Sequence, residues 1–259
     1  NYKANFKFMS QALALAKKSQ AKARPNPSVG AIVVKDEKIV GKGSHETAGQ
    51  DHAEVIALKD AGLLSKGADL YVTLEPCNHQ GKTPPCTSRI ISAGISNVYI
   101  AMKDPNPLVN GLGIEYLKNN GINVISGIME EEAEKLNLGF INRMIKSRPY
   151  IRSKIAISLD GKTSLFNGQS QWITSEASRA DVQKWRLKSC GILTGRGTIN
   201  SDDPSLSVRT LSLNHQPLRI ILDSHLRVKV ESKILQQSNV IVFYGADKNL
   251  NLTKLKKTK

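Results

Sequence analysis

The stretch Asp51-His52-Ala53-Glu54, followed by Pro76-Cys77 and then by Cys86, carries the most information in this 259-residue chain. It supplies one imidazole and two thiols, which are common zinc ligands in proteins. The remaining cysteine, Cys190, lies more than a hundred residues further along, so the local set offers three protein ligands. A structural zinc site normally closes with four protein ligands, whereas a catalytic site keeps one position open. The stretch therefore predicts an open Zn²⁺ site.

A carboxylate accompanies the predicted ligands. Glu54 follows His52 by two residues, and on one helical turn it can reach a water in the fourth zinc position. Zinc lowers the pKa of such a water to roughly 7, and Glu54 would take the proton and return it to a departing amine. Taken singly, each residue also fits a core histidine, a capping glutamate or a buried thiol. Their joint occurrence in this order favours hydrolytic deamination.

The composition excludes several classes of protein. A hydrophobic content of 40% with 23% charged residues is typical of a folded globular chain. The apolar runs are too short to span a membrane, and no signal-peptide pattern is present. Three cysteines do not form a disulfide framework, so we expect a reducing, cytoplasmic setting. The formal charge of +15 fits anionic small substrates, and a nucleic-acid partner is the less favoured alternative because the basic residues are scattered.

The first half alternates between helical and strand patterns. Phe6, Met9, Leu13 and Ala16 are spaced as on an amphipathic helix, and Asp51 is a plausible cap for a second helix. Further helices are expected at 51–61, from 86, at 113–119 and at 130–146, and strands at 29–34, 39–43, 69–74, 98–102 and 122–125. The turn Asp36-Glu37-Lys38 joins the first two of these strands into a hairpin. This alternation predicts an α/β sandwich with parallel strands.

A linker is expected at Lys146-Ser147-Arg148-Pro149, after which the alternation restarts. Strands are predicted at 150–158, 191–194, 218–222 and 240–244, and a helix at 176–188. We therefore predict two domains, 1–146 and 150–259. No Gly-x-Gly-x-x-Gly follows a strand, so a Rossmann dinucleotide site is not supported. The glycine-rich segment 194–198 fits a turn at a strand end, and Cys190 fits a small core residue.

The spacing of the two motif cysteines is unusual. Nucleotide and tRNA deaminases carry Pro-Cys-x-x-Cys, whereas eight residues separate Cys77 from Cys86 here. Together with Arg24-Pro25-Asn26-Pro27-Ser28-Val29-Gly30-Ala31 and the later segments 154–162 and 194–198, this loop resembles the bifunctional riboflavin-biosynthesis deaminase/reductase family along the whole chain. The resemblance implies a cytidine-deaminase-like three-layer sandwich followed by a dihydrofolate-reductase-like α/β domain.

The resemblance also implies a substrate site in the first half, for a diaminopyrimidinone that carries a ribosylamino phosphate. Asn26 would hydrogen-bond the pyrimidine, while His45, His79 and Lys82 would line the pocket. The chemistry agrees, because an amide offers paired donor and acceptor groups and cationic side chains suit a phosphate. Two alternatives stay open: Asn26, between two prolines, fits a turn residue, and His45 fits an ordinary loop histidine.

For the second half, the resemblance implies NADPH-dependent reduction of the ribose to a ribityl chain. The positions that would contact NADPH are Ala156, Trp172, Thr198, Asp202 and Ser224. Those that would bind the substrate are Lys154, Ser170, Arg186, Leu206 and Arg209, with the arginines on its phosphate and Asp160 as a further support. Trp172 also fits a core aromatic residue, and Arg186 also fits a solvated helix face. The resemblance suggests a homo-oligomer.

The family's reductase half continues past the position of Lys259, with a late acidic substrate residue and a glycine-rich cofactor-binding stretch. We therefore expect an intact deaminase site and an impaired reductase. Two other functions fit parts of the sequence. A deaminase of cytosine or adenine in nucleosides or tRNA is disfavoured by the long cysteine loop and the second domain. A nucleic-acid-binding protein with a structural zinc is disfavoured by the open three-ligand set beside Glu54.

Overall fold

The computed structural model describes residues 2–47, 49–80, 84–209 and 216–245. It divides into two compact units, Asn1–Arg152 and Ser153–Lys259, and each is described by itself.

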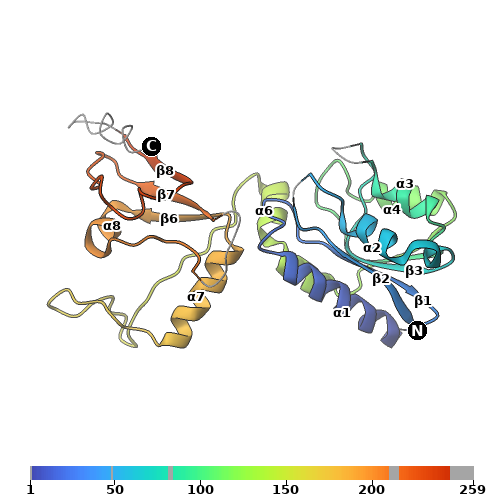
Figure 1. The fold of residues 1–259 in the computed structure, drawn as a ribbon, viewed down its shortest axis with the longest axis horizontal. Coiled ribbons are helices and arrows are strands. Elements are labelled where there is room, and N and C mark those ends of the chain that lie inside the picture. The colour runs from blue at the N-terminus through green and yellow to red at the C-terminus, as the bar shows by residue number, and fades with distance from the viewer. Residues whose placement is uncertain (1, 48, 81–83, 210–215, 246–259) are drawn as a thin grey trace. The chain divides into compact units, whose positions relative to one another are not determined.

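The first unit contains, in chain order, α1 (Tyr2–Ser19), β1 (Gly30–Lys35), β2 (Lys38–Ser44), α2 (Ala53–Ala61), the 3-10 helix η1 (Gly62–Ser65), β3 (Asp69–Leu74), α3 (Cys86–Ser92), β4 (Asn97–Met102), α4 (Leu112–Asn119), β5 (Asn123–Ser126), α5 (Glu130–Leu136) and α6 (Leu138–Lys146) (Figure 1). The second unit contains α7 (Glu176–Lys188), β6 (Gly191–Gly195), α8 (Arg196–Asp202), β7 (Leu218–Leu222) and β8 (Val240–Phe243).

The first unit is built on one sheet with the strand order β2-β1-β3-β4-β5. Strands β3, β4 and β5 are parallel, whereas β1 is antiparallel to both β2 and β3. The prediction of parallel strands holds for β3, β4 and β5, and β1 and β2 form the predicted hairpin. The antiparallel pairing of β1 with β3 was not predicted. Helices α1 and α5 pack on one face, and α2, α3 and α4 cover the other (Figure 1). This is the expected three-layer sandwich.

Close contact between α2 and β2 depends on glycine. A Cβ on Gly43 would lie 2.1 Å from the carbonyl oxygen of Ala53, and one on Gly41 would lie 2.2 Å from that of Ala57. No side chain larger than hydrogen fits at either position unless the helix moves away from the strand. Since α2 begins directly after His52, this contact sets the height of that residue above the sheet.

A polar ladder fixes the register of the parallel strands. At their amino ends, the Asn97 amide donates to Asp69 at 2.7 Å, and the Asn123 amide donates to Asn97 at 3.0 Å. These are also the residues that face one another in the strand pairings. A slip of one residue would break both bonds and turn the buried side chains of β4 outward. The ladder therefore aligns the carboxyl ends of the strands, where the candidate site lies.

The helix predicted over 130–146 is wrong as a single element, since it is interrupted at Asn137. The buried Asn137 side chain accepts a hydrogen bond from the backbone N–H of Ser28 at 2.7 Å and donates to the Ser28 carbonyl at 3.1 Å. Residue 137 adopts φ −120° and ends α5 before α6 begins. A tertiary hydrogen-bonded pair thus overrides the local helical pattern.

The start of α2 also differs from the prediction. The N-cap is His52, with φ −74° and ψ 162°, and α2 begins at Ala53. Asp51 is not the cap; its carboxylate pairs with Lys59 at 2.5 Å. His52 carries no side-chain capping bond, because its ring is turned toward the two cysteines.

The second unit contains a parallel three-stranded sheet in the order β6-β7-β8. Its core is small and centres on Ile199, Ile221, Val228 and Ile234. The strand predicted over 150–158 is absent from the described structure: this segment forms no strand pairing, and Ile151, Ile155 and Ile157 are exposed. Alternation of apolar residues makes a strand only where a neighbouring strand offers hydrogen bonds.

Two further expectations for the second unit are wrong. The segment 194–198 is not merely a turn, because α8 begins at Arg196 directly after β6. Cys190 is exposed and does not lie in the core. Among the described residues, none of the helices has the length and apolar character needed to cross a membrane.

Candidate metal and substrate site

Three elements bring the predicted metal ligands together. His52 caps α2, Cys77 follows β3, and Cys86 is the first residue of α3. The Nδ1 atom of His52 lies 3.2 Å from the Cys86 sulfur and 3.6 Å from the Cys77 sulfur. All three ligand atoms lie within 4.8 Å of one another, and they form a possible metal-binding group.

This donor set fits zinc. Tetrahedral Zn²⁺ with a nitrogen ligand at about 2.1 Å and a sulfur ligand at about 2.3 Å separates those two atoms by about 3.6 Å. The observed nitrogen–sulfur distances of 3.2 and 3.6 Å are close to that value. Hydrogen bonds from Cys86 and His52 lower the pKa of the Cys77 thiol to about 4, although burial opposes the shift. A thiolate is the form that binds a metal.

Glu54 lies in the first turn of α2 and is almost completely buried, with 3% of its surface exposed. Burial raises the pKa of its carboxyl group to about 7, while the positive charge of His52 and a hydrogen bond with Cys86 act in the opposite direction. A buried acid beside a metal cluster, with a pKa near neutrality, is suited to accept and release protons.

Asn26 and His45 form a pair beside the metal cluster. The Nδ2 atom of Asn26 lies 3.2 Å from Nε2 of His45, and the His45 ring packs edge-on to that of His52, with 5.5 Å between centroids. Burial lowers the pKa of His45. Asn26 does lie in a turn, since its N–H donates to the carbonyl of Ala23, but its side chain reaches the site. His45 is buried, so it is not an ordinary loop histidine.

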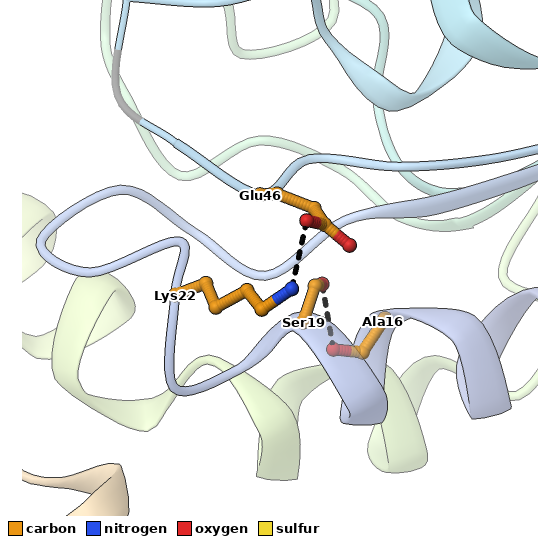
Figure 2. A network of polar contacts seen from close by, with 4 residues as sticks. All are labelled: Ala16, Ser19, Lys22 and Glu46. Atoms are coloured by element: carbon orange, nitrogen blue, oxygen red, sulfur yellow. Dashed lines mark hydrogen bonds and ion pairs between the residues drawn. The ribbon is translucent and has the colours of Figure 1, made fainter. Parts of the chain in front are cut away.

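The segment that carries His45 is tied to the end of α1. Figure 2 shows Lys22 and Glu46 facing each other, and their Nζ and Oε2 atoms lie 2.9 Å apart. Beneath them, the hydroxyl of Ser19, the last residue of α1, donates to the Ala16 carbonyl at 3.1 Å. An exposed ion pair contributes only about 0–1 kcal/mol, so its effect is to guide the segment after β2 and not to hold the fold.

The structure describes only one of the two other substrate-site residues predicted in the first half, His79 and Lys82. His79 is exposed, and its charge acts on the buried Asp104. Lys82 lies outside the described residues. Asp104 was not singled out from the sequence: burial, assisted by the charges of Glu75 and Cys77, raises its pKa to about 6. Its place two residues after β4 was the available signal, because the carboxyl ends of parallel strands meet at one edge.

In the second unit, the structure brings only some predicted residues together. Arg186 on α7 donates to the Ser207 carbonyl at 3.2 Å, and its pKa is lowered by burial and by the nearby charge of Arg209. Two guanidinium groups near one another, one of them half-buried, suit an anionic ligand. The Arg209 N–H donates to Gln183 on the same helix, which fixes the segment that carries it.

The remaining predicted residues of this unit are more dispersed. Trp172 is 70% exposed and stacks under the Arg179 guanidinium at 4.3 Å, so it is not a core residue. Leu206 adopts a left-handed backbone with φ 50°. The others lie on exposed or half-buried surface in the segment before α7, on α8 and after β7: Lys154, Ala156, Asp160, Ser170, Thr198, Asp202 and Ser224. Their roles stay predictions.

The three-layer fold and the open His-Cys-Cys set with its buried glutamate define the first unit as a zinc-binding domain of the deaminase class. The family model described as cytidine and deoxycytidylate deaminase zinc-binding region matches residues 3–102, and that of the RibD C-terminal domain matches residues 149–258. The chain belongs to the RibD family of riboflavin biosynthesis proteins. A structure of RibD from Acinetobacter baumannii superposes with a TM-score of 0.91 at 44% identity, covering 100% of this chain and 73% of that one.

Further relatives are also riboflavin biosynthesis proteins of the RibD family. The riboflavin biosynthesis protein RibD of Aquifex aeolicus is 51% identical over 228 residues, which cover 88% of this chain and 64% of that protein. A Thermotoga maritima structure, described as a diaminohydroxyphosphoribosylaminopyrimidine deaminase/5-amino-6-(5-phosphoribosylamino)uracil reductase, superposes with a TM-score of 0.89 at 43% identity, covering 95% of this chain and 71% of that one. The chain spans slightly less than two thirds of the length of the first curated relatives that it matches.

Proposed function

We propose that the first unit catalyses the hydrolytic deamination of a phosphorylated diaminopyrimidine in riboflavin biosynthesis, and that the second unit binds NADPH to reduce the ribose of the product. The observation that carries the proposal is the fully buried Glu54 beside an open set of one imidazole and two thiols. The Thermotoga maritima relative, whose name describes both reactions, supports the choice of substrate.

In the deamination, the oxygen of water adds to the ring carbon, the bond from that carbon to the amino nitrogen breaks, and ammonia leaves. Bound Zn²⁺ would lower the pKa of a coordinated water to about 7. Glu54 would accept a proton from the water and deliver it to the departing amine, so its carboxyl group returns to its starting state. The burial that raises the pKa of Glu54 to about 7 makes both transfers accessible at neutral pH.

The pyrimidine would be recognised by the pair of Asn26 and His45. One N–H of the Asn26 amide is directed at His45, which leaves its second N–H and its carbonyl oxygen for the edge of a heterocycle. His79 and Lys82 would bind the phosphate from the loop between the two cysteines. In the second unit, Arg186 and Arg209 would bind the same phosphate after deamination. The NADPH contacts proposed there are Ala156, Trp172, Thr198, Asp202 and Ser224.

We also propose a homo-oligomer in a cytoplasmic setting. One face of the β6-β7-β8 sheet exposes Leu193, Leu222, Ile241 and Phe243, and strand pairing places them side by side. Contiguous exposed apolar side chains are typical of an interface. The free thiols of the metal cluster need a reducing compartment to stay available for zinc.

The proposal is tested by mass spectrometry of the products formed from the phosphorylated diaminopyrimidine, with zinc-loaded protein, in the presence and absence of NADPH. We expect the deaminated product with zinc alone. When NADPH is added, conversion to the ribityl product would support the proposed reductase and contradict the impaired reductase that the sequence predicts. Deaminated product that accumulates unreduced with NADPH present would contradict the proposed reductase. Absence of deamination, with one zinc confirmed per chain, would contradict the deaminase and point to a nucleoside or tRNA substrate.

A further inference from the structure

A second buried carboxylate lies two residues before the ligand Cys77. Glu75, with 3% of its surface exposed, follows the last residue of β3. Its Oε2 atom accepts the backbone N–H groups of Asp104 at 3.2 Å and Gly111 at 2.9 Å. Its Oε1 atom accepts those of Gly113 at 3.0 Å and Ile114 at 3.1 Å. One carboxylate therefore satisfies four backbone donors, which uses all the lone-pair sites that it offers.

These four donors come from two different segments. Asp104 and Gly111 lie at the two ends of the loop between β4 and α4, and Gly113 and Ile114 lie in the first turn of α4. The N–H groups of a first helical turn have no partner within their own helix. Glu75 supplies that partner from another element and fastens the loop and the helix to the end of β3.

The backbone next to Glu75 is confined on several sides. A Cβ on Gly113 would lie 2.1 Å from the carbonyl oxygen of Pro76, so α4 packs directly against this peptide. The N–H of Glu75 donates to the Met102 carbonyl at 3.0 Å. Beyond Pro76, the Cys77 carbonyl accepts from the N–H of Thr87 at 3.2 Å. The Cys77 sulfur thus stands on a backbone whose position depends on α4 and therefore on the bonds of Glu75.

We propose that Glu75 is a positioning residue of the deaminase site. Its carboxylate holds α4 and the preceding loop against the Pro76-Cys77 peptide, and this sets the Cys77 sulfur at its distance from His52 and Cys86. The same bonds fix the start of the loop at the buried residue Asp104. The consequence for turnover rests on the proposed function, whereas the consequence for metal binding does not.

The test is Glu75→Gln, with Glu115→Gln as the matched control. The amide keeps the size of the side chain but places an NH₂ group against two backbone N–H donors, so two of the four bonds are lost. Glu115 lies in the first turn of the same helix and is exposed, so its replacement removes the same charge and no bond to the loop. Zinc affinity is measured by competition with a chromogenic chelator, and the cobalt-loaded proteins are compared by their sulfur-to-metal absorption.

We expect Glu75→Gln to lower zinc affinity about 10-fold or more, the usual effect of removing a group that orients a metal ligand. The absorption of the cobalt form should shift, because the Cys77 sulfur is displaced. The zinc affinity of Glu115→Gln should lie within about twofold of the wild-type value, which is small beside the roughly 10-fold effect expected for Glu75→Gln. Unchanged zinc affinity together with an unchanged cobalt spectrum in Glu75→Gln would overturn the inference.

If Glu75→Gln does not fold, amide hydrogen exchange of the wild-type protein tests the inference instead. Zinc should slow the exchange of the Gly111, Gly113 and Ile114 amides, since these bonds and the Cys77 segment are mechanically linked. An unchanged exchange rate at these amides on zinc loading would overturn the inference. If the protein shows these metal effects but does not deaminate the diaminopyrimidine, the result would support the positioning role of Glu75 and contradict the proposed function. A wild-type chain that binds no zinc would overturn both.

Discussion

Asn26 and His45 are joined side chain to side chain, with 3.2 Å between Nδ2 of the amide and Nε2 of the ring. On the other side of the ring, Nδ1 of His45 lies 3.2 Å from the carbonyl oxygen of Asp51. A carbonyl oxygen can only accept, so Nδ1 carries the proton and Nε2 accepts from Asn26. The structure thereby selects a neutral ring in one tautomer, which fixes the orientation of the Asn26 amide.

The first prediction concerns the titration of His45. Burial lowers its pKa below 6.5, and the charge of His52 acts in the same direction. The unfolded chain binds this proton more readily than the folded one. The contribution of His45 to the free energy of unfolding is therefore fully present above about pH 6.5 and is lost as the pH falls below that value. NMR titration of the ring should give a pKa under 6.5. A pKa above 6.5 would mean that the ring is charged and that the assigned tautomer is wrong.

A second prediction follows from the contact between α2 and β2. Gly43→Ala would force a methyl group into the Ala53 carbonyl, 2.1 Å away. The unfolding free energy should fall by about 1–3 kcal/mol or more, as measured by urea denaturation. Gly139→Ala on α6 is the control, because a Cβ there meets nothing within 4 Å. That variant should be neutral or slightly stabilising. Equal effects of the two changes would show that α2 is free to shift on β2.

The third prediction concerns the metal. Zinc binds the folded cluster of His52, Cys77 and Cys86 and should raise the unfolding free energy by about 2.7 kcal/mol at a concentration 100 times its dissociation constant. A chelator should reverse the effect. Cys190→Ser provides the control, because this exposed cysteine belongs to the second unit and its loss should leave the zinc effect intact. A zinc effect that disappears in Cys190→Ser would place the metal elsewhere.

The fourth prediction concerns Arg186 in the second unit. This half-buried guanidinium shares its surroundings with Arg209. Arg186→Gln should weaken binding of the phosphorylated deamination product about 10-fold, as measured by calorimetry, since one charge-assisted contact is worth about 1.5–3 kcal/mol. Lys184→Gln on the same helix is the control, because Lys184 is exposed and pairs only weakly with Asp181. If both variants bind alike, the phosphate does not lie at Arg186.

The sequence predicted the parts of the fold that local pattern controls. Strand β3, over 69–74, and helix α7, over 176–188, have the predicted bounds, because periodic apolar residues and clear breaks define both. The interruption at Asn137 and the capping role of His52 were missed, since each depends on contacts with segments distant in the sequence. The strand predicted over 150–158 shows the same limit, because alternation cannot reveal whether a partner strand is present.

The site residues likewise divide into those that the sequence reveals and those that depend on contacts distant in the sequence. His52, Cys77 and Cys86 were recognisable because metal binding restricts the residue type at each position. Glu75 was not, because its partners are backbone N–H groups, which leave no mark in the sequence. Asp104 was passed over although it follows a predicted strand, because its position along the chain does not show how close that strand end lies to Cys77.

The role of Glu54 is the central claim, and it is tested most directly by measuring zinc content and deamination rate together in Glu54→Gln. Since we propose that Glu54 moves the protons, and since it is not one of the three ligands, one zinc per chain should remain while the deamination rate falls on the order of 10²–10⁴-fold. Glu115→Gln should change neither quantity. Full deaminase activity in Glu54→Gln with zinc retained would contradict the assigned role.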